Sequence, residues 1–482
     1  VTNTLDEDTS IHWHGLLLPF QMDGVPGISF PGIKPGQTFS YDFPIRQSGT
    51  YWYHSHSGLQ EQQGHYGPLI IDPAGDEPAE YDRDHILLLS EFTPLHPHRI
   101  MDRLRKGEGY FNYQQTSWAD DYPLSAEDRR MWAGMRMPAT DIADVTGATY
   151  TYLANGRGPK EGLEYLFKPG ERVRLRVING SAMTFFNLRI PGLAMTVIAA
   201  DGQNVKPVEV DEFQIGTAET YDVIVEPRAD EAYGFIAEAI DRSGQVRATL
   251  APRLGMVAPI PPIRERPLLT MKDMGMGDMD MSGGATAGAD HSGMAMGAIA
   301  ADCSPEHAKM GHCTPSDAAA PAVDHSAMGH GAGGMSHSMR DFSVAPQVKR
   351  DPSVQTISPM PVDRMGEPGQ GLENVGHKVM TYHDLVALDR NPDVRAPERS
   401  LDIHLTGNME RFMWSFDGVK LSENPEPIAF RHNERVRVTL INDTMMTHPI
   451  HLHGMFFDLV VGDTDHKPRK HTVTVKPAER LS

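Results

Sequence analysis

Short stretches in which hydrophobic and polar residues alternate recur along the chain, and they predict β-strands. Residues 167–175 and 430–438 show the same alternation, and both contain Glu-Arg-Val-Arg followed by an aliphatic residue. Successive side chains of a strand point to opposite faces, so this pattern turns the aliphatic residues toward one buried face. The sequence therefore predicts an all-β protein whose sheets pack around hydrophobic cores.

One β unit is used three times, because three segments align without a gap. Each begins at an asparagine: Asn3, Asn179 and Asn442. At equal distances beyond it, the last copy carries three histidines, the first a threonine and two histidines, and the middle copy only apolar residues. The aligned positions are Thr9, His12 and His14; Phe185, Leu188 and Ile190; and His448, His451 and His453. We infer that the first and last copies turn metal ligands inward and that the middle copy keeps the fold without the metal.

The repeat sets the expected domain boundaries. We predict a first domain over 1–73, a second over 84–255 and a third over 378–482. The strand that precedes the second and third copies has no counterpart before Val1. The first domain is therefore expected to lack its N-terminal strands, and the last to lack its C-terminal ones.

Residues 271–340 differ in composition from the rest, being rich in Gly, Ala, Met, His and Asp. Such a segment buries too little apolar surface to offset its ordering entropy, so we expect a disordered insert. Thioether sulfur selects Cu(I), which makes the insert a candidate copper-binding segment; a plain flexible linker is the alternative. Its Cys303 and Cys313 could form a disulfide, bind a soft metal or remain free thiols. The candidate Cu(I)-binding methionines at its start are Met274, Met276, Met279 and Met281.

The overall charge and hydropathy exclude two classes of partner. The formal net charge of −20 argues against nucleic acid and fits cationic partners such as metal ions, although solubility alone explains it equally well. No apolar run approaches the ~20 residues needed to cross a bilayer, so we expect no membrane insertion.

Three pairs of histidines are separated by a single residue in strand-like surroundings. Residues i and i+2 of a strand point the same way, so each pair presents two imidazoles to one side. His448 is offset by three positions from the third pair and is expected to face a different centre. Imidazole-rich sites suit copper, zinc, iron or nickel, and the Met-rich insert favours copper. The pairs are His12 with His14, His54 with His56, and His451 with His453.

With these motifs the chain resembles the three-domain multicopper oxidases, and most of all the bacterial periplasmic copper-resistance oxidases. His-Trp-His-Gly at 12–15, Tyr-His-Ser-His at 53–56 and His-Pro-Ile-His-Leu-His-Gly at 448–454 match three of the family's four copper motifs. The stretch 131–147 and the insert narrow the resemblance to the copper-resistance branch. The resemblance implies cupredoxin-like Greek-key β-sandwich domains and a periplasmic location.

The resemblance also implies four coppers in the complete protein: one type 1, one type 2 and two type 3. Asp23 matches an acid near the trinuclear cluster, where a carboxylate can relay protons, although a turn residue before glycine is an equal alternative. The matching motifs imply that the type 2 copper is bound by His12 and His451 and the type 1 copper by His448. They imply that the type 3 pair is bound by His14, His54, His56 and His453.

The family's fourth motif, His-Cys-His, is not found in the chain. By the internal repeat it is expected ~15 residues past Ser482, and neither insert cysteine can replace it. Without it each type 3 copper would lose one ligand and the type 1 copper its thiolate. The 482 residues as written are therefore expected to be an inactive fragment of an active oxidase.

The predicted function is oxidation of Cu(I), with phenolic compounds as a further substrate class, coupled to four-electron reduction of dioxygen to water. A copper-sequestering periplasmic protein and a laccase-type phenol oxidase are the alternatives. The protein is expected to be a monomer, since three domains can build the copper sites within one chain. Further methionines that could bind Cu(I), with core packing as their alternative role, are Met135, Met137, Met409, Met413, Met445 and Met446.

Overall fold

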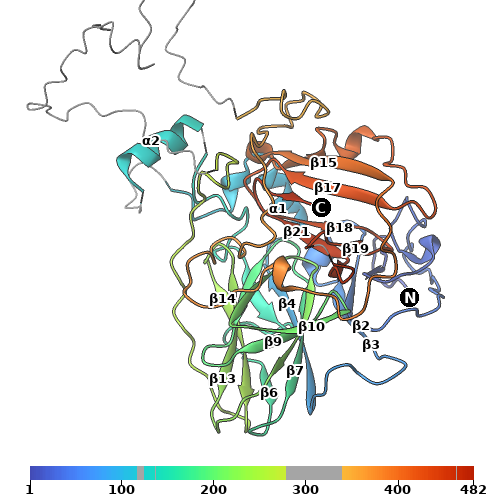
Figure 1. Cartoon of the computed structure of the whole chain (residues 1–482), viewed down its shortest axis with the longest axis vertical. Helices are drawn as coiled ribbons and strands as arrows, with labels where there is room; N and C mark the ends of the chain where they lie inside the picture. The colour runs from blue at the N-terminus through green and yellow to red at the C-terminus, as the bar shows by residue number, and fades with distance from the viewer. Residues whose placement is uncertain (117–123, 136, 278–338, 463) are drawn as a thin grey trace, which may run out of the picture. The chain divides into compact units, whose positions relative to one another are not determined.

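β-Strands account for nearly all the regular structure in the computed structural model of the chain (Figure 1), which describes residues 1–116, 124–135, 137–277, 339–462 and 464–482. Among these residues only two α-helices occur, α1 (Pro97–Leu104) and α2 (Ala126–Met135). The predicted all-β class is confirmed. Short 3-10 helices are η1 (Phe20–Met22), η2 (Glu61–Gln63), η3 (Glu108–Tyr110), η6 (Tyr382–Asp384), η7 (Met409–Arg411) and η8 (Leu421–Glu423).

The N-terminal region contains one antiparallel sheet of three strands in the order β1-β2-β3. Trp52 of the central strand is fully buried and packs with Leu88 and Ile178 of the next region, so the sheet is fixed through an aromatic contact. The strands are β1 (His12–His14), β2 (Gly49–His54) and β3 (Tyr66–Ile71).

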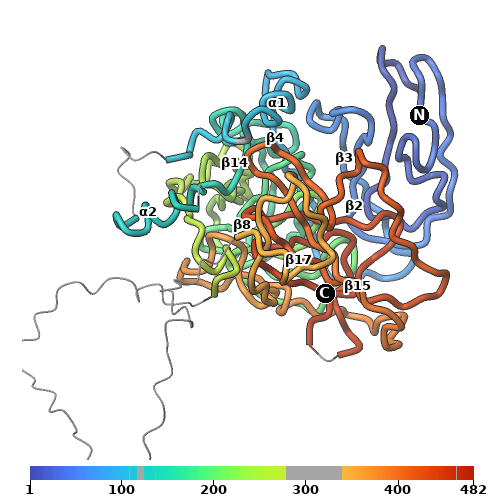
Figure 2. Tube along the Cα trace, turned by 90° about the horizontal axis from the view of Figure 1, so that it is seen from above, coloured from blue at the N-terminus to red at the C-terminus, as the bar shows by residue number. Residues whose placement is uncertain are grey.

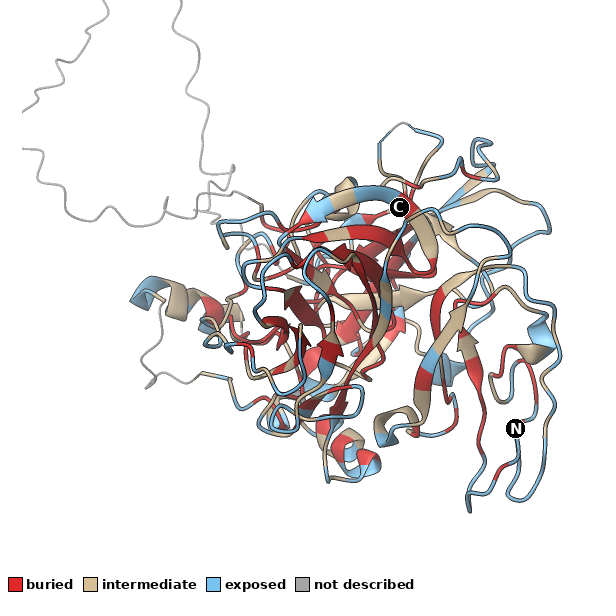
Figure 3. Ribbon diagram, turned by 90° about the horizontal axis from the view of Figure 1, so that it is seen from below, coloured by how far each residue is buried: buried red, intermediate tan, exposed pale blue. Residues whose placement is uncertain are grey.

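The middle region is a sandwich of two sheets, with strand orders β10-β9-β12-β7-β4-β5 and β11-β8-β13-β14-β6. Val173, Leu175 and Val177 alternate inward from β7 and meet Phe186 and Phe213 of the other sheet in one buried cluster. Figure 3 shows buried residues concentrated on the strands in the interior of the molecule. The strands are β4 (Arg83–Phe92), β5 (Thr151–Ala154), β6 (Glu164–Leu166), β7 (Val173–Asn179), β8 (Phe186–Arg189), β9 (Met195–Ala200), β10 (Gln203–Val210), β11 (Glu212–Ile215), β12 (Thr220–Val225), β13 (Tyr233–Ala239) and β14 (Gln245–Ala251).

The C-terminal region has a sheet in the order β16-β15-β17-β22 and two strand pairs, β18-β21 and β19-β20. Its segments lie beside the N-terminal ones (Figure 2), as the contact between His453 and Asp23 also shows. The strands are β15 (Arg399–Asn408), β16 (Met413–Phe416), β17 (Val436–Asn442), β18 (His448–His451), β19 (Phe457–Asp458), β20 (Arg469–Lys470), β21 (Thr472–Val475) and β22 (Arg480–Leu481).

The threefold repeat is visible in how its three asparagines are bonded. Each buried side-chain amide donates to two backbone carbonyls, one shortly ahead in the chain and one in a neighbouring segment. From Nδ2 to the carbonyl oxygen, the distances for Asn3 are 2.8 Å to both Glu7 and Ile33. For Asn179 they are 2.9 Å to Thr184 and 3.2 Å to Ile215. For Asn442 they are 2.7 Å to Met446 and 3.0 Å to Val475. The asparagine therefore fixes the turn that leads into the aligned positions in every copy.

The start of the Met-rich insert differs from the sequence prediction. Met274 and Met276, expected in a disordered segment, are 3% and 4% exposed. The buried pair of Asp273 and Arg364, 2.8 Å apart, anchors this stretch, so an ion pair supplies the fixed contact that composition did not reveal. Residues 271–277 and 339–340 thus belong to the folded unit. Met279, Met281, Cys303 and Cys313 lie outside the described residues, so the predictions for them stay predictions.

Candidate copper centre

The first two histidine pairs come together because β1 and β2 pair in antiparallel register. His12 lies opposite His54, and His14 lies opposite Trp52. The ring centroids of His12 and His14, and those of His12 and His54, are 5.4 Å apart. Candidate ligand nitrogens of His12, His14 and His54 lie within 4.8 Å of one another, and all three residues are buried. Alternation along a strand therefore gathers imidazoles on one side, as the spacing predicts.

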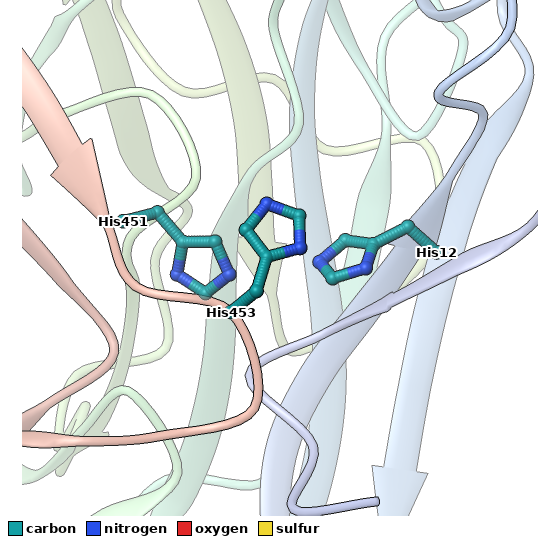
Figure 4. A group of neighbouring side chains, drawn as sticks. All are labelled: His12, His451 and His453. Carbon is teal, nitrogen blue, oxygen red and sulfur yellow. The ribbon is translucent and has the colours of Figure 1, made fainter. Parts of the chain in front are cut away.

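The third pair arrives from the C-terminal region and completes the cluster. The ring of His451 stacks on that of His14 with centroids 3.8 Å apart, and His453 approaches His12 at 4.3 Å. Figure 4 shows the ring of His453 lying between those of His451 and His12. His56 lies 4.8 Å from His12, so the structure brings all six predicted histidines of the three pairs together.

The ring nitrogens of this cluster are arranged as a metal site requires. The Nδ1 atoms of His12 and His451 donate to the carbonyls of Asp23 and His471, at 2.7 and 2.6 Å. Their Nε2 atoms are then bare, and both are buried without a hydrogen-bond partner among the described residues. Burial lowers the pKa of His12 and holds that of His451 well below its usual value, which keeps both rings neutral. Bare, neutral imidazoles oriented by carbonyls fit copper.

Asp23 joins the two halves of the cluster. Its carboxylate accepts from His453 Nδ1 at 2.8 Å, and its other oxygen lies 3.4 Å from His12 Nδ1. Burial alone would raise the pKa of Asp23, but the contacts with His12 and His453 outweigh it and hold that pKa well below its usual range. Asp23 is therefore a buried carboxylate that contacts a histidine from each half of the cluster.

His448 stands apart from the six clustered histidines. It begins β18, three positions before His451; its Nε2 lies 2.7 Å from Thr444 Oγ1, and the ring of Trp414 packs at 4.6 Å. Burial lowers the pKa of His448 to about 4. It lines a pocket of about 210 Å³ together with Asp144, Asp241 and Met183. His448 thus lies apart from the six clustered histidines, in agreement with its offset in the sequence.

The candidate methionines are divided among several places. Met446 lines the His448 pocket, whereas Met445 and Met274 line a separate small cavity with Met339. Met137 and Met409 are buried, and Met135 and Met413 are half-buried. Met446 is therefore the candidate that the structure brings to His448.

Sequence reasoning missed His471, which lies fully buried beside His14 and His451. Its ring centroid is 4.9 Å from that of His14. No paired spacing marks it, because the residue precedes an ordinary alternating strand. Only the pairing of β21 with β18, which sets Thr472 opposite His451, brings it to the cluster.

A buried ion network ties the middle region to the segment that carries His471. Lys470 Nζ lies 3.0 Å from Asp201 and 3.1 Å from Glu219. Burial by itself would lower the pKa of Lys470, but the two carboxylates raise it above its usual value, so the residue stays charged. The middle region, which lacks histidines at the repeat positions, therefore still holds the cluster in place.

Comparison with known proteins agrees with this geometry. Family models described as multicopper oxidase match residues 1–76, 120–252 and 395–482. The chain is 50% identical over 498 residues to copper resistance protein A of Escherichia coli and 49% identical over 497 residues to that of Pseudomonas syringae pv. tomato, covering all of this chain and 80% of each relative.

Solved structures show the same fold at lower identity. Fet3p, a multicopper oxidase that functions in iron import, matches with a TM-score of 0.59 at 16% identity, over 100% of this chain and 75% of that one. The laccase from Botrytis aclada matches with a TM-score of 0.54 at 20% identity, over 100% and 73%. The resemblance found in the sequence, to the copper-resistance branch included, is confirmed, and the chain belongs to the multicopper oxidases, copper enzymes that reduce dioxygen.

Proposed function

We propose that the protein is a copper-resistance oxidase that couples oxidation of Cu(I) to reduction of dioxygen. Four Cu(I) ions each give one electron, and one dioxygen takes these with four protons to form two waters. The observation that carries the proposal is the set of six histidines whose rings converge, with the bare Nε2 atoms of His12 and His451 buried among them. The relatives named copper resistance protein A support Cu(I) as the substrate.

We assign the histidines as the motifs suggest. His12 and His451 would hold the type 2 copper, and His448 the type 1 copper. Bound copper supplies the one-electron steps that dioxygen reduction needs. Asp23 orients His453 and keeps a carboxylate close to the cluster, where it can relay protons for dioxygen reduction. The type 3 pair would be held by His14, His54, His56 and His453.

The pocket at His448 supports a metal substrate and also keeps phenol oxidation as a second candidate. Asp241 and the Met446 thioether supply an anionic group and a soft ligand, which suit Cu(I). Phe412 and Trp414 in the same wall would suit a phenol ring. Oxygen uptake measured with Cu(I) and with a phenol separates the two, and Met446→Leu should lower only the Cu(I) rate.

Copper loading followed by oxygen uptake tests the proposal as a whole. The protein should bind copper through the clustered histidines and, when it also carries a His-Cys-His motif, consume oxygen when Cu(I) is added. Copper binding without oxygen uptake in such a protein would favour the sequestering alternative. Its absorption spectrum would show whether a type 1 copper forms.

We place the protein in the periplasm as a monomer. Oxidation of Cu(I) belongs in an oxidising compartment, and the branch that the sequence resembles is periplasmic. No helix among the described residues is long and apolar enough to span a membrane. Fractionation and sedimentation would test the two assignments.

A further inference from the structure

The turn that joins β9 to β10 is buried inside the protein. Ala200 and Gln203 pair across it, so the turn consists of Asp201 and Gly202 alone. Both residues have positive φ, +50° and +71°, as in the type I′ turn that suits an Asp-Gly sequence. Most turns lie on the surface, but Asp201 is fully buried. Burial of this turn indicates that other regions of the protein pack on it.

The carboxylate of Asp201 holds a segment of the C-terminal region. Its Oδ2 atom accepts the backbone N–H groups of His471 and Thr472, both at 3.1 Å, and lies 3.0 Å from Lys470 Nζ. Its Oδ1 atom accepts the backbone N–H of Thr220, in the middle region, at 2.9 Å. A carboxylate only accepts, so all these donors are satisfied at once. Asp201 therefore fixes three consecutive residues of the C-terminal region against the middle region.

The segment that Asp201 holds orients one of the clustered histidines. The backbone carbonyl of His471 accepts from Nδ1 of His451 at 2.6 Å. This carbonyl and the N–H of Thr472 belong to one planar peptide group, so the bond from Thr472 to Asp201 also fixes the carbonyl. A histidine that binds metal needs its second ring nitrogen held by such an acceptor. Asp201 thus acts on the ring of His451 through a single peptide group.

Gly202 packs against the strand that carries His54 at its end. Strand β2 begins at Gly49, where a Cβ would lie 2.4 Å from the carbonyl oxygen of Gly202. A Cβ at Gly202 would lie 2.3 Å from Cζ of Tyr51, which is fully buried. Both separations are shorter than real Cβ contacts, so neither position has room for a side chain. The turn therefore lies directly against β2.

We propose that the Asp201–Gly202 turn is a positioning element of the copper cluster, which fixes the strand carrying His54 and the segment that orients His451 relative to each other. The imidazoles come from the N-terminal and C-terminal regions, so contacts between regions must set their separation. Metal ligands have to be held within about 0.5 Å of their working geometry. A buried two-residue turn that touches both regions can do this without supplying a ligand. The inference rests on the proposed function.

Substitution of the carboxylate tests the contact with the C-terminal region. Asp201→Asn replaces one oxygen by an NH2 group, which cannot accept, so either Thr220 or the segment at His471 and Thr472 loses its bond. Copper retention against a competing chelator should weaken by about 10- to 100-fold, the loss typical of groups that orient a ligand. The electron paramagnetic resonance spectrum of the type 2 Cu(II) should change as well.

Glu238→Gln is the matched control for this variant. Glu238 is also fully buried, accepts the backbone N–H of Arg264 at 3.0 Å and forms an ion pair with Arg242 at 2.9 Å, but it lies on β13 in the other sheet of the middle region. Both variants should lower the free energy of unfolding in urea titrations. Only Asp201→Asn should change copper retention and the Cu(II) spectrum. Equal retention and equal spectra in the two variants would overturn the inference.

A second pair of variants tests the contact with β2. Gly202→Ala places a methyl group against Tyr51, whereas Gly156→Ala adds one where nothing lies within 4 Å. The two glycines have φ of +71° and +74°, so the backbone cost of alanine is the same in both. Copper retention should fall by about 10-fold or more in Gly202→Ala and stay normal in Gly156→Ala. Normal retention in a folded Gly202→Ala variant would contradict the proposal.

The unaltered protein separates failure of this inference from failure of the proposed function. If it binds no copper, the proposed function is overturned together with the inference. If it binds copper and the paired variants behave alike, only the positioning role of the turn is overturned. Circular dichroism shows which variants fold, and should Gly202→Ala not fold, the comparison of Asp201→Asn with Glu238→Gln decides.

Discussion

The middle and last copies of the repeat share one backbone arrangement but differ in the side chains that they enclose. Asn179 and Asn442 make equivalent hydrogen bonds, and each lies on a strand with a parallel neighbour, Leu89 and Leu405 being their partners in register. Beyond the turn, however, the middle copy buries Leu188 at 0% exposure, whereas the last presents His451 to the cluster. The comparison shows that the hydrogen-bonded asparagine fixes the backbone of the repeat unit. The side chains that follow the asparagine determine whether the unit encloses an apolar core or a metal site.

The largest effect is expected when the last copy is given the apolar residue of the middle one. His451→Leu removes a bare nitrogen of the cluster, so oxygen uptake of a protein that also carries the His-Cys-His motif should fall by more than about 100-fold, beyond the loss typical of residues that only orient a ligand. Copper should also be lost from the cluster.

The matched change in the middle copy should act on stability instead. Leu188→Ala is expected to lower the free energy of unfolding by about 2–5 kcal/mol while copper content per folded chain stays normal. Normal oxygen uptake in His451→Leu would contradict the assignment of this histidine to the copper centre.

The hydrogen bonds of the aligned asparagine can be removed in either copy of the repeat by substitution of Asn179 or Asn442. Asn179→Ala and Asn442→Ala each leave two buried carbonyls without their donor, so the free energy of unfolding should fall by about 3 kcal/mol in urea titrations. Only Asn442→Ala should also reduce copper content, because its turn leads into the histidines. Asn408→Ala, whose amide bonds the carbonyl of Pro352 at an exposed site, is the control. Equal copper loss in all three variants would contradict the comparison.

Acid should destabilise the metal-free protein through the histidine-bearing copy. Burial lowers the pKa of His471 from 6.5 to about 4, so the unfolded chain binds a proton that the native chain does not. Stability should therefore fall as the pH drops from about 6.5 toward 4, by on the order of 3 kcal/mol for this residue. Urea titrations over this pH range measure the slope, which should be shallower in His471→Asn. A stability that rises on acidification would refute the assignment of a neutral buried ring.

The smallest effect is expected at Asp23, which joins the first and last copies. Asp23→Asn keeps an oxygen for His453 but removes the charge, so copper retention should weaken by about 10-fold, at the low end for groups that orient a ligand. The backbone carbonyl that accepts from His12 is unchanged, so the type 2 assignment predicts that His12 keeps its orientation. Unaltered copper retention together with unaltered oxygen uptake would indicate that Asp23 acts only as a turn residue.

The sequence by itself determined the repeat and the pairing of histidines, because each depends on local spacing. The alternation over 167–175 and 430–438 predicted the strands only in part, since β7 begins at Val173 and β17 at Val436. Residues two apart in a strand share a face, so His12 and His14 point the same way wherever that strand lies. The offset of His448 is equally local, and it correctly separates this residue from the cluster.

Tertiary structure alone decided which distant groups meet. His471 has no local signal, and it reaches His14 only because β21 pairs with β18 and Asp201 of the middle region holds its backbone. Composition suggested a disordered stretch at Met274 and Met276, yet a buried ion pair between Asp273 and Arg364 anchors them. Contacts between residues far apart in the chain depend on packing and charge pairing across regions, and neither is encoded in the spacing of neighbouring residues.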